Sequence, residues 1–127
     1  MKSVFGDAEI AGVKLKNRII RSATHEGMAD KNGCPTEMLL KKYELLARGE
    51  VGAIITGYAA IQQSGKCSMY NSLMIDSDSQ IRSFEELTHR VHEQGTAIFL
   101  QIAHCVRQTR SEMHPLKCYC GRMPGKV

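Results

Sequence analysis

The sequence lacks the features that would place the protein in a membrane, on a nucleic acid or outside the cell. No apolar run approaches the length of a membrane-spanning helix. The net charge of +4 comes from basic residues that are spread along the chain, not from a block that would bind nucleic acid or lipid. The first residues, Met1–Asp7, lack the apolar core of a signal peptide, and the odd number of cysteines, five, favours reduced thiols over a disulfide framework. We therefore expect a cytoplasmic protein with no nucleic-acid or membrane partner.

The sequence also lacks the short motifs of a self-contained cofactor site. It has no G-x-G-x-x-G and no phosphate-binding P-loop, so a stand-alone nucleotide-binding domain has little support. Cys118 and Cys120, with His114 upstream, have no second cysteine pair to complete a zinc site, and we expect no metal there. Residues 113–127 show no period of 2 or 3.6 and contain two prolines. They predict a disordered tail behind a folded part at 1–112.

The chain does contain a pattern in which strands and helices alternate. A hydrophobic content of 43% and a charged content of 24% are typical of a globular domain. Alternation of this kind predicts an α/β fold with a parallel sheet and right-handed crossovers. The predicted elements are a hairpin at 8–15, strands at 19–25, 51–61 and 96–104, a helix from the N-cap Thr36 to Gly49, a polar connection at 62–76 and a helix from Ser77 or Asp78 to Gly95.

The third strand, 96–104, is the stretch that suggests a ligand site. Ile98, Phe99, Leu100 and Ile102 read as a strand that is covered on both faces. Gln101 interrupts this run near its carboxyl end, where α/β folds place their ligands. Its side chain offers a donor and an acceptor to a heterocycle edge, although a structural amide that meets the next loop explains it equally well.

Other candidates have structural explanations of similar weight. His25 at the end of the first strand is a possible proton shuttle, but a solvent-exposed histidine is more common at such a place. Gly57 would let a flat ligand approach the backbone, or it serves a turn. The remaining candidates are interpreted as ordinary thiols (Cys34, Cys67 and Cys105) and as a solvated helix face (His89 and His92).

Four motifs taken together carry a family resemblance. Leu15–Ile19, Ser22–His25, Gly52–Gly57 and Leu100–His104, in this order and spacing, resemble the old yellow enzyme family. The Thr-His-x-Gly form at 24–27 is most similar to the branch that contains bacterial 2,4-dienoyl-CoA reductase. The resemblance covers residues 5–112 and implies the first three β/α units of a TIM (β/α)8 barrel, preceded by a short hairpin.

The resemblance also implies a cofactor and roles for particular residues. Members are FMN-dependent oxidoreductases in which a hydride passes from NAD(P)H to flavin N5 and then to an activated alkene or enoyl compound. His25 would lie beside the flavin ring as the catalytic candidate, and Gln101 would bind the pyrimidine edge of the ring. The implied cofactor-binding set is Ser22, Ala23, Thr24, His25, Gly57, Tyr58 and Gln101.

Two departures from the family pattern qualify this interpretation. Val106 stands where members usually have glycine, and the chain supplies three of the eight strands that a barrel needs. The sequence is therefore interpreted as a fragment from a frameshifted or prematurely ended reading frame. An iron–sulfur cluster, present in some members, would belong to the absent part. We expect a marginally stable chain that binds FMN weakly and self-associates through open sheet edges. The alternatives are a non-catalytic α/β binding module and a subunit that completes a split barrel with a second chain.

Overall fold

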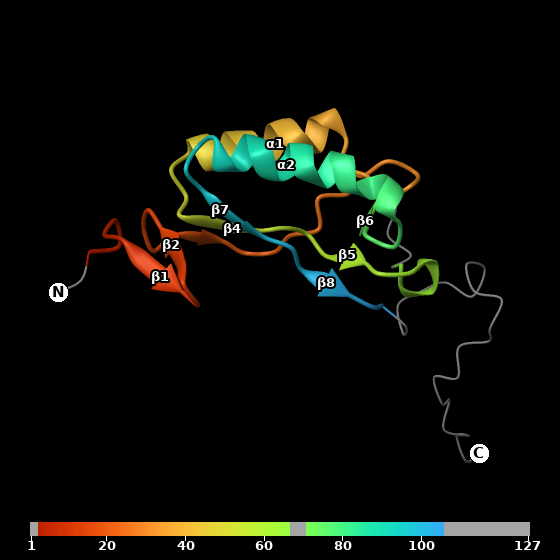
Figure 1. Ribbon diagram of the computed structural model, residues 1–127, viewed down its shortest axis with the longest axis horizontal. Coiled ribbons are helices and arrows are strands. Elements are labelled where there is room, and N and C mark those ends of the chain that lie inside the picture. Colours follow the sequence, from red (N-terminus) through yellow and green to blue (C-terminus); the bar gives the residue numbers. More distant parts are fainter. Residues whose placement is uncertain (1–2, 67–70, 106–127) are drawn as a thin grey trace, which may run out of the picture.

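The computed structural model describes residues 3–66 and 71–105, and it begins with a hairpin that leads into alternating strands and helices (Figure 1). The hairpin is formed by β1 (Ala8–Ile10) and β2 (Val13–Leu15), which pair antiparallel through a turn at Ala11 and Gly12. The prediction of a hairpin at 8–15 is confirmed. The expected tail at 113–127, with its Cys-x-Cys pair, lies outside the described residues. In the part that is described, no helix is long and apolar enough to cross a membrane.

The main sheet has three parallel strands in the order β3, β4, β7. These are β3 (Ile20–Arg21), β4 (Ala53–Ile55) and β7 (Ala97–Phe99), and they pair with Arg21 opposite Ile54 and with Ile54 opposite Ile98. Each strand of the sheet comes from one of the three predicted strand segments. The predicted parallel sheet is therefore confirmed.

Two of the predicted strands are interrupted rather than continuous. The segment 51–61 forms β4, then breaks at 56–58, and continues as β5 (Ala59–Ala60). The segment 96–104 forms β7, breaks at 100–101, and continues as β8 (Ile102–Ala103). The breaks lie side by side, so that β5 and β8 pair in a second parallel sheet beyond the end of the first (Figure 1).

The second sheet also corrects the prediction of a purely polar connection at 62–76. That segment contains the 3-10 turn Gln63–Gly65 and β6 (Leu73–Met74), which pairs with β5 on the side opposite β8. Leu73 and Met74 are buried, and Gly33 packs so closely on Met74 that a Cβ at Gly33 would lie 2.4 Å from the Met74 Cβ. A strand of two residues is too short to give a periodic signal in the sequence.

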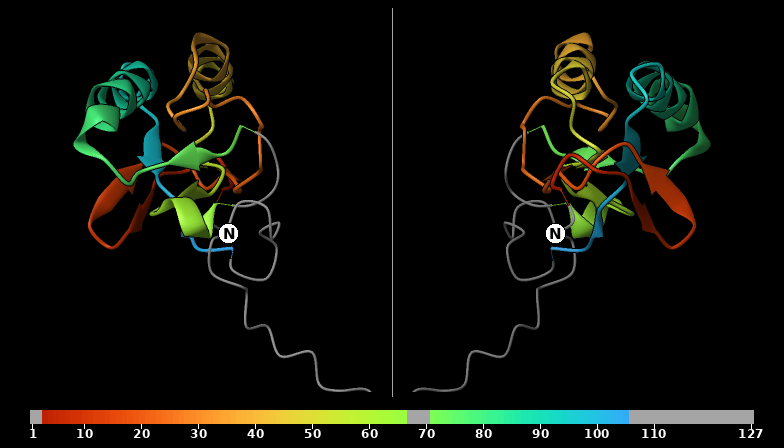
Figure 2. Two further views of the ribbon diagram at one scale, coloured as in Figure 1. Left: turned by 90° about the vertical axis from the view of Figure 1, so that its right-hand side faces the viewer. Right: turned by 90° about the vertical axis from the view of Figure 1, so that its left-hand side faces the viewer.

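Both helices begin where the sequence predicts. Thr36 caps α1 (Glu37–Arg48), accepting a hydrogen bond from the Leu39 N–H, and Gly49 follows the last turn. Ser77 and Gln80 form a capping box on the 3-10 turn Asp78–Gln80, which runs directly into α2 (Ile81–His92). Gly95, with a φ of +65°, follows the second helix. The two helices lie together on one face of the sheet (Figures 1 and 2).

The core lies between the helices and this face of the sheet. Its buried members include Leu39 and Tyr43 from α1, Leu87 and Val91 from α2, and Ile54 from β4. The opposite face is open, because Ile20 is 41% exposed and Ile102 is 61% exposed. The prediction that 96–104 is covered on both faces is therefore wrong for the described chain. β7 and β8 are the outer strands of their sheets, and among the described residues no further strand pairs with their outer edges.

Candidate functional site

Two groups of predicted site residues lie together at the carboxyl ends of the strands. One group follows β3, and Gly57 follows β4. The segment after β3, which carries Ser22, Ala23 and Thr24, lies directly against the break after β4. A Cβ on Gly57 would lie 2.6 Å from the Thr24 carbonyl oxygen, so only glycine allows this approach. The position of Gly57 is thus required by the neighbouring backbone within the chain itself.

His25 and Tyr58 meet at this junction as a stacked pair. Their ring centroids are 5.3 Å apart and the ring planes differ by 17°. Both residues are half-buried, so part of the stack remains accessible at the end of the sheet. The predicted catalytic residue and a predicted cofactor-binding residue therefore form one unit.

Gln101 lies at the break of the third strand with its backbone fixed and its side chain exposed. Its N–H donates to Thr56 Oγ1 at 3.2 Å, and its carbonyl oxygen accepts from the Ala59 N–H at 2.7 Å. Within the part of the chain that the structure describes, the side-chain amide makes no hydrogen bond. The loop that follows this strand lies outside the described residues, so the alternative of a structural amide that meets that loop stays a prediction beside that of a ligand-binding amide.

Tyr43 in α1 contacts the strand end that carries Gly57, although it is absent from the set of predicted site residues. Its hydroxyl oxygen accepts a hydrogen bond from the Gly57 N–H at 3.0 Å. Burial, followed by the nearby Glu26 carboxylate, raises the pKa of Tyr43 above its ordinary value, while the bond from Gly57 opposes the rise. Tyr43 therefore stays neutral and holds the strand-end backbone in place.

A charge cluster centred on the Glu26 carboxylate, whose side chain is 6% exposed, adjoins the segment 22–25. The Glu26 carboxylate pairs with the Arg21 guanidinium at 3.1 Å and, through its other oxygen, with the Lys42 ammonium. Arg21 also donates to the Ser22 carbonyl oxygen at 2.9 Å and to the Thr24 hydroxyl. Sequence analysis missed this cluster, because its members are ordinary charged residues whose pairing depends on the contact between β3 and α1.

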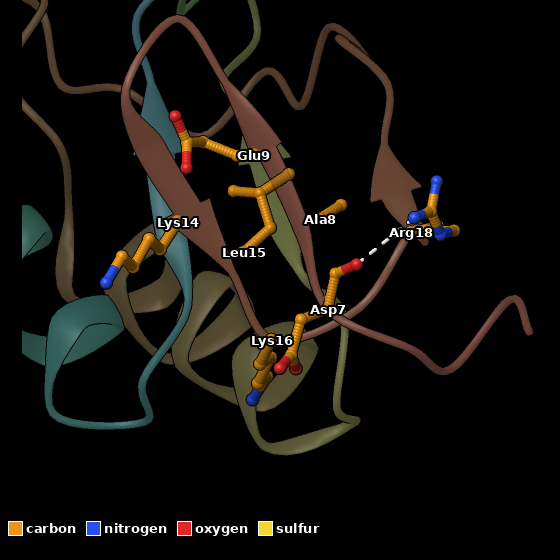
Figure 3. Close-up of a pocket in the computed structure, with 7 residues that line it drawn as sticks. All are labelled: Asp7, Ala8, Glu9, Lys14, Leu15, Lys16 and Arg18. Atoms are coloured by element: carbon orange, nitrogen blue, oxygen red, sulfur yellow. Dashed lines mark hydrogen bonds between the residues drawn. The ribbon is translucent and has the colours of Figure 1, made fainter. Parts of the chain in front are cut away.

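Two hollows of very different size lie at opposite ends of the sheet. Under His25 and Tyr58 there is a small enclosed space, with room for about 10 Å³, that is lined in part by Tyr43 and Gly57. A hollow of about 550 Å³ lies at the hairpin, where Leu15 forms its floor and charged side chains surround it (Figure 3). The larger hollow is at the amino ends of the strands, where barrel enzymes do not place chemistry, so its size does not make it the active site.

The other candidate residues are placed apart from this junction. His89 pairs with Glu93 on the exposed face of α2, which confirms its assignment to a solvated face. Cys34 and Cys105 are not joined to each other in a disulfide, and Cys67 lies outside the described residues. Within residues 3–66 and 71–105, no group of three or more His, Cys, Asp or Glu side chains is arranged to hold a metal ion.

Comparison with known proteins gives matches along most of the chain. The sequence model of the NADH:flavin oxidoreductase / NADH oxidase family matches residues 3–125. This match runs past residue 112, where the sequence analysis expected the folded part to end. The NADPH dehydrogenase of Bacillus subtilis is 34% identical over 116 residues, which are 87% of this chain and 33% of that protein. The NADH oxidase of Thermoanaerobacter brockii is 31% identical over 107 residues, covering 84% of this chain and 16% of that protein.

Solved structures agree with the fold. The old yellow enzyme homologue from Zymomonas mobilis superposes with a TM-score of 0.80 at 29% identity, over 88% of this chain and 31% of that one. Morphinone reductase in complex with tetrahydroNAD gives a TM-score of 0.81 at 21% identity, which supports the fold alone. These enzymes are TIM barrels, so the three parallel strands and two helices described here correspond to part of such a barrel, and within the described residues the sheet does not close.

The chain spans about a third or less of the length of the relatives it matches. The resemblance found in the motifs of the sequence is confirmed by these matches. The chain belongs to the NADH:flavin oxidoreductase / NADH oxidase family.

Proposed function

We propose that this chain supplies one part of an FMN site in an NAD(P)H-dependent oxidoreductase of the ene-reductase type. The observation that carries the proposal is the junction of three parallel strand ends. Gln101, with an exposed amide, follows β7, and Gly57 follows β4, the strand that pairs with β7. The stacked rings of His25 and Tyr58 lie at the same strand ends. Ligands of α/β barrels bind at this edge of the sheet.

The residues at the junction fit a flat heterocycle. Gln101 would hold the pyrimidine edge of the isoalloxazine through its amide donor and acceptor. Gly57 lets the first two strand ends approach each other, since a Cβ there would lie 2.6 Å from the Thr24 carbonyl oxygen. Ser22, Ala23 and Thr24 would line the ring from the first strand. His25, beside the ring, would stabilise its charge or donate a proton at the substrate. When bound, FMN supplies the hydride acceptor and donor between NAD(P)H and an activated alkene or enoyl compound.

The open face of the sheet supports a proposal about partners. Ile20 and Ile102 are exposed, and β3 and β7 each have one unpaired edge among the described residues. In a closed barrel, further strands would pair with these edges. We propose that the remaining strands of the barrel, on this or a second chain, cover this face, and that the chain self-associates without them. We also propose a cytosolic location with reduced cysteines, which fits the free thiol of Cys34. An iron–sulfur cluster would need ligands outside the described residues.

A chimeric enzyme tests the proposed function. Residues 3–105 of this chain replace the matching segment of the Bacillus subtilis NADPH dehydrogenase, which supplies the rest of the barrel. The expected result is a yellow protein that binds FMN and oxidises NAD(P)H when 2-cyclohexenone is added as the alkene. A folded chimera, with helical circular dichroism and a cooperative melting transition, that takes up no FMN would contradict the proposal.

A further inference from the structure

Two consecutive residues of α1, Lys42 and Tyr43, reach two different strand-end segments. The Lys42 ammonium pairs with the Glu26 carboxylate, and the Tyr43 hydroxyl accepts a hydrogen bond from the Gly57 N–H at 3.0 Å. Glu26 directly follows His25, and Gly57 directly precedes Tyr58. One turn of a helix is therefore bonded to the residues on either side of the stacked pair.

The pairing of Glu26 is built for a buried position. Its side chain is only 6% exposed, and its two oxygens are divided between Arg21 and Lys42. A carboxylate at this depth is costly unless it is paired, and removal of one partner leaves an uncompensated charge. Arg21 also donates hydrogen bonds to the Ser22 carbonyl oxygen and the Thr24 hydroxyl. One guanidinium therefore contacts three residues of the segment 22–26.

Lys42, Tyr43 and Glu26 are not among the residues that are proposed to contact the flavin. Helix α1 could be fixed to the sheet by apolar contacts alone, as Leu39 and Leu40 already do in the core. The polar groups instead bond the loops that follow the strands. We propose that Lys42 and Tyr43 are positioning residues that set the geometry of the His25–Tyr58 stack, and through it the geometry of the flavin site, an inference that rests on the proposed function.

The first experiment needs no flavin. In the full chain labelled with ¹³C-histidine, the His25 ring resonance, assigned with His25→Asn, carries a ring-current shift from the stacked Tyr58. Lys42→Met, Glu26→Gln and Tyr43→Phe should each remove this shift, whereas Lys42→Arg should restore it. Lys41→Met is the matched control, because it removes the same charge from the preceding residue of the helix, where the side chain is 71% exposed and pairs only with Glu37 in the described chain. Lys41→Met should leave the His25 resonance unchanged.

The second experiment measures flavin binding by the chimera that carries the same substitutions. Lys42→Met and Tyr43→Phe should raise the dissociation constant of FMN about tenfold, the effect expected when a hydrogen bond to a charged or buried group is lost, and Lys41→Met should not. They should also change the reduction potential of the bound flavin, because His25 would move relative to the ring. A purely structural role of these residues would lower the melting temperature without either change.

The two experiments separate this inference from the proposed function. The inference is overturned if Lys42→Met lowers the melting temperature but leaves the His25 resonance and the FMN affinity equal to those of Lys41→Met. If the unsubstituted chimera binds no FMN, while Lys42→Met still removes the His25 shift in the chain, the positioning of the stack is supported and the proposed function is contradicted.

Discussion

The two ends of the three-stranded sheet have opposite characters. At the amino end, the Asn17 side chain is buried, donates to the Glu50 carbonyl oxygen at 2.6 Å and accepts from the Ile19 N–H at 2.9 Å. Gly52 packs directly on it, since a Cβ there would lie 2.4 Å from the Asn17 carbonyl oxygen. At the carboxyl end, the strands break, and Gln101 presents its amide to solvent.

The difference indicates that the amino end of the sheet contributes to stability and that the carboxyl end carries the proposed ligand site. Polar groups at the amino end bond one another and hold the hairpin, sheet and helices together. At the carboxyl end, the Gln101 backbone is fixed by hydrogen bonds while its side chain is exposed. Substitutions at the amino end should therefore change stability, and substitutions at the carboxyl end should change binding.

The largest expected effect is at Asn17. Asn17→Ala removes two hydrogen bonds and leaves the Glu50 carbonyl and the Ile19 N–H without their partner. We expect the free energy of unfolding to fall by about 3 kcal/mol, as measured by urea denaturation of the chain. Asn32→Ala, at an exposed side chain, is the control and should change stability by no more than about 0.5 kcal/mol. Equal effects of the two substitutions would remove the distinction between the ends.

The second prediction concerns the opposite end. Gln101→Ala in the chimera should raise the FMN dissociation constant about tenfold, because an amide that would bond the flavin edge is lost. The same substitution should change the unfolding free energy of the chain by less than about 0.5 kcal/mol, since the side chain is exposed. A large loss of stability with unchanged FMN affinity would reverse the assignment of the two ends.

A smaller effect is expected at Lys16. Its ammonium donates to the carbonyl oxygens of Gln94 at 2.9 Å and Ala47 at 3.4 Å, and so bonds the carboxyl ends of both helices. Lys16→Met should lower the unfolding free energy by about 1 kcal/mol. Lys14→Met on the same hairpin strand, where the side chain is exposed, is the control for charge and should be close to neutral.

The smallest effect is expected from an ion pair that belongs to neither end. The hydrogen bond from Arg90, the largest cause, lowers the pKa of the exposed Glu37 below its ordinary value of 4.5. Its stabilising contribution is therefore complete above that value and is lost as the pH falls through the lower pKa of the folded state. Urea midpoints followed from about pH 6 to about pH 3 should show a slightly steeper acid loss for the native chain than for Arg90→Gln. Parallel curves would show that the pair contributes nothing.

Elements with local signals were predictable from the sequence. The caps Thr36 and Ser77 each act on backbone groups within three residues, so a short stretch of sequence determines them. The hairpin at 8–15 is similarly local. The positions of Gln101, His25 and Gly57 at adjacent strand ends followed from strand alternation together with the family resemblance.

Features that depend on distant pairing were not predictable. The strand breaks at 56–58 and 100–101 arise from two segments that are far apart in the sequence. The bonds from Tyr43 to Gly57 and from Lys42 to Glu26 require the packing of α1 on the sheet, and neither residue type suggests it. The open face could not be read from the run at 98–102, since an apolar run gives the same pattern whether or not further strands cover it.

The Thr56 hydroxyl takes the place of a backbone acceptor at the point where the two strands break. It accepts the Gln101 N–H that a continuous ladder would have matched with a carbonyl oxygen, so a side chain replaces one rung of the sheet. A lineage that exchanged Thr56 for serine would retain the rung, whereas valine, nearly the same shape, would abolish it without disturbing the packing. The backbone hydrogen bond of Gln101 at this break therefore depends on one hydroxyl group.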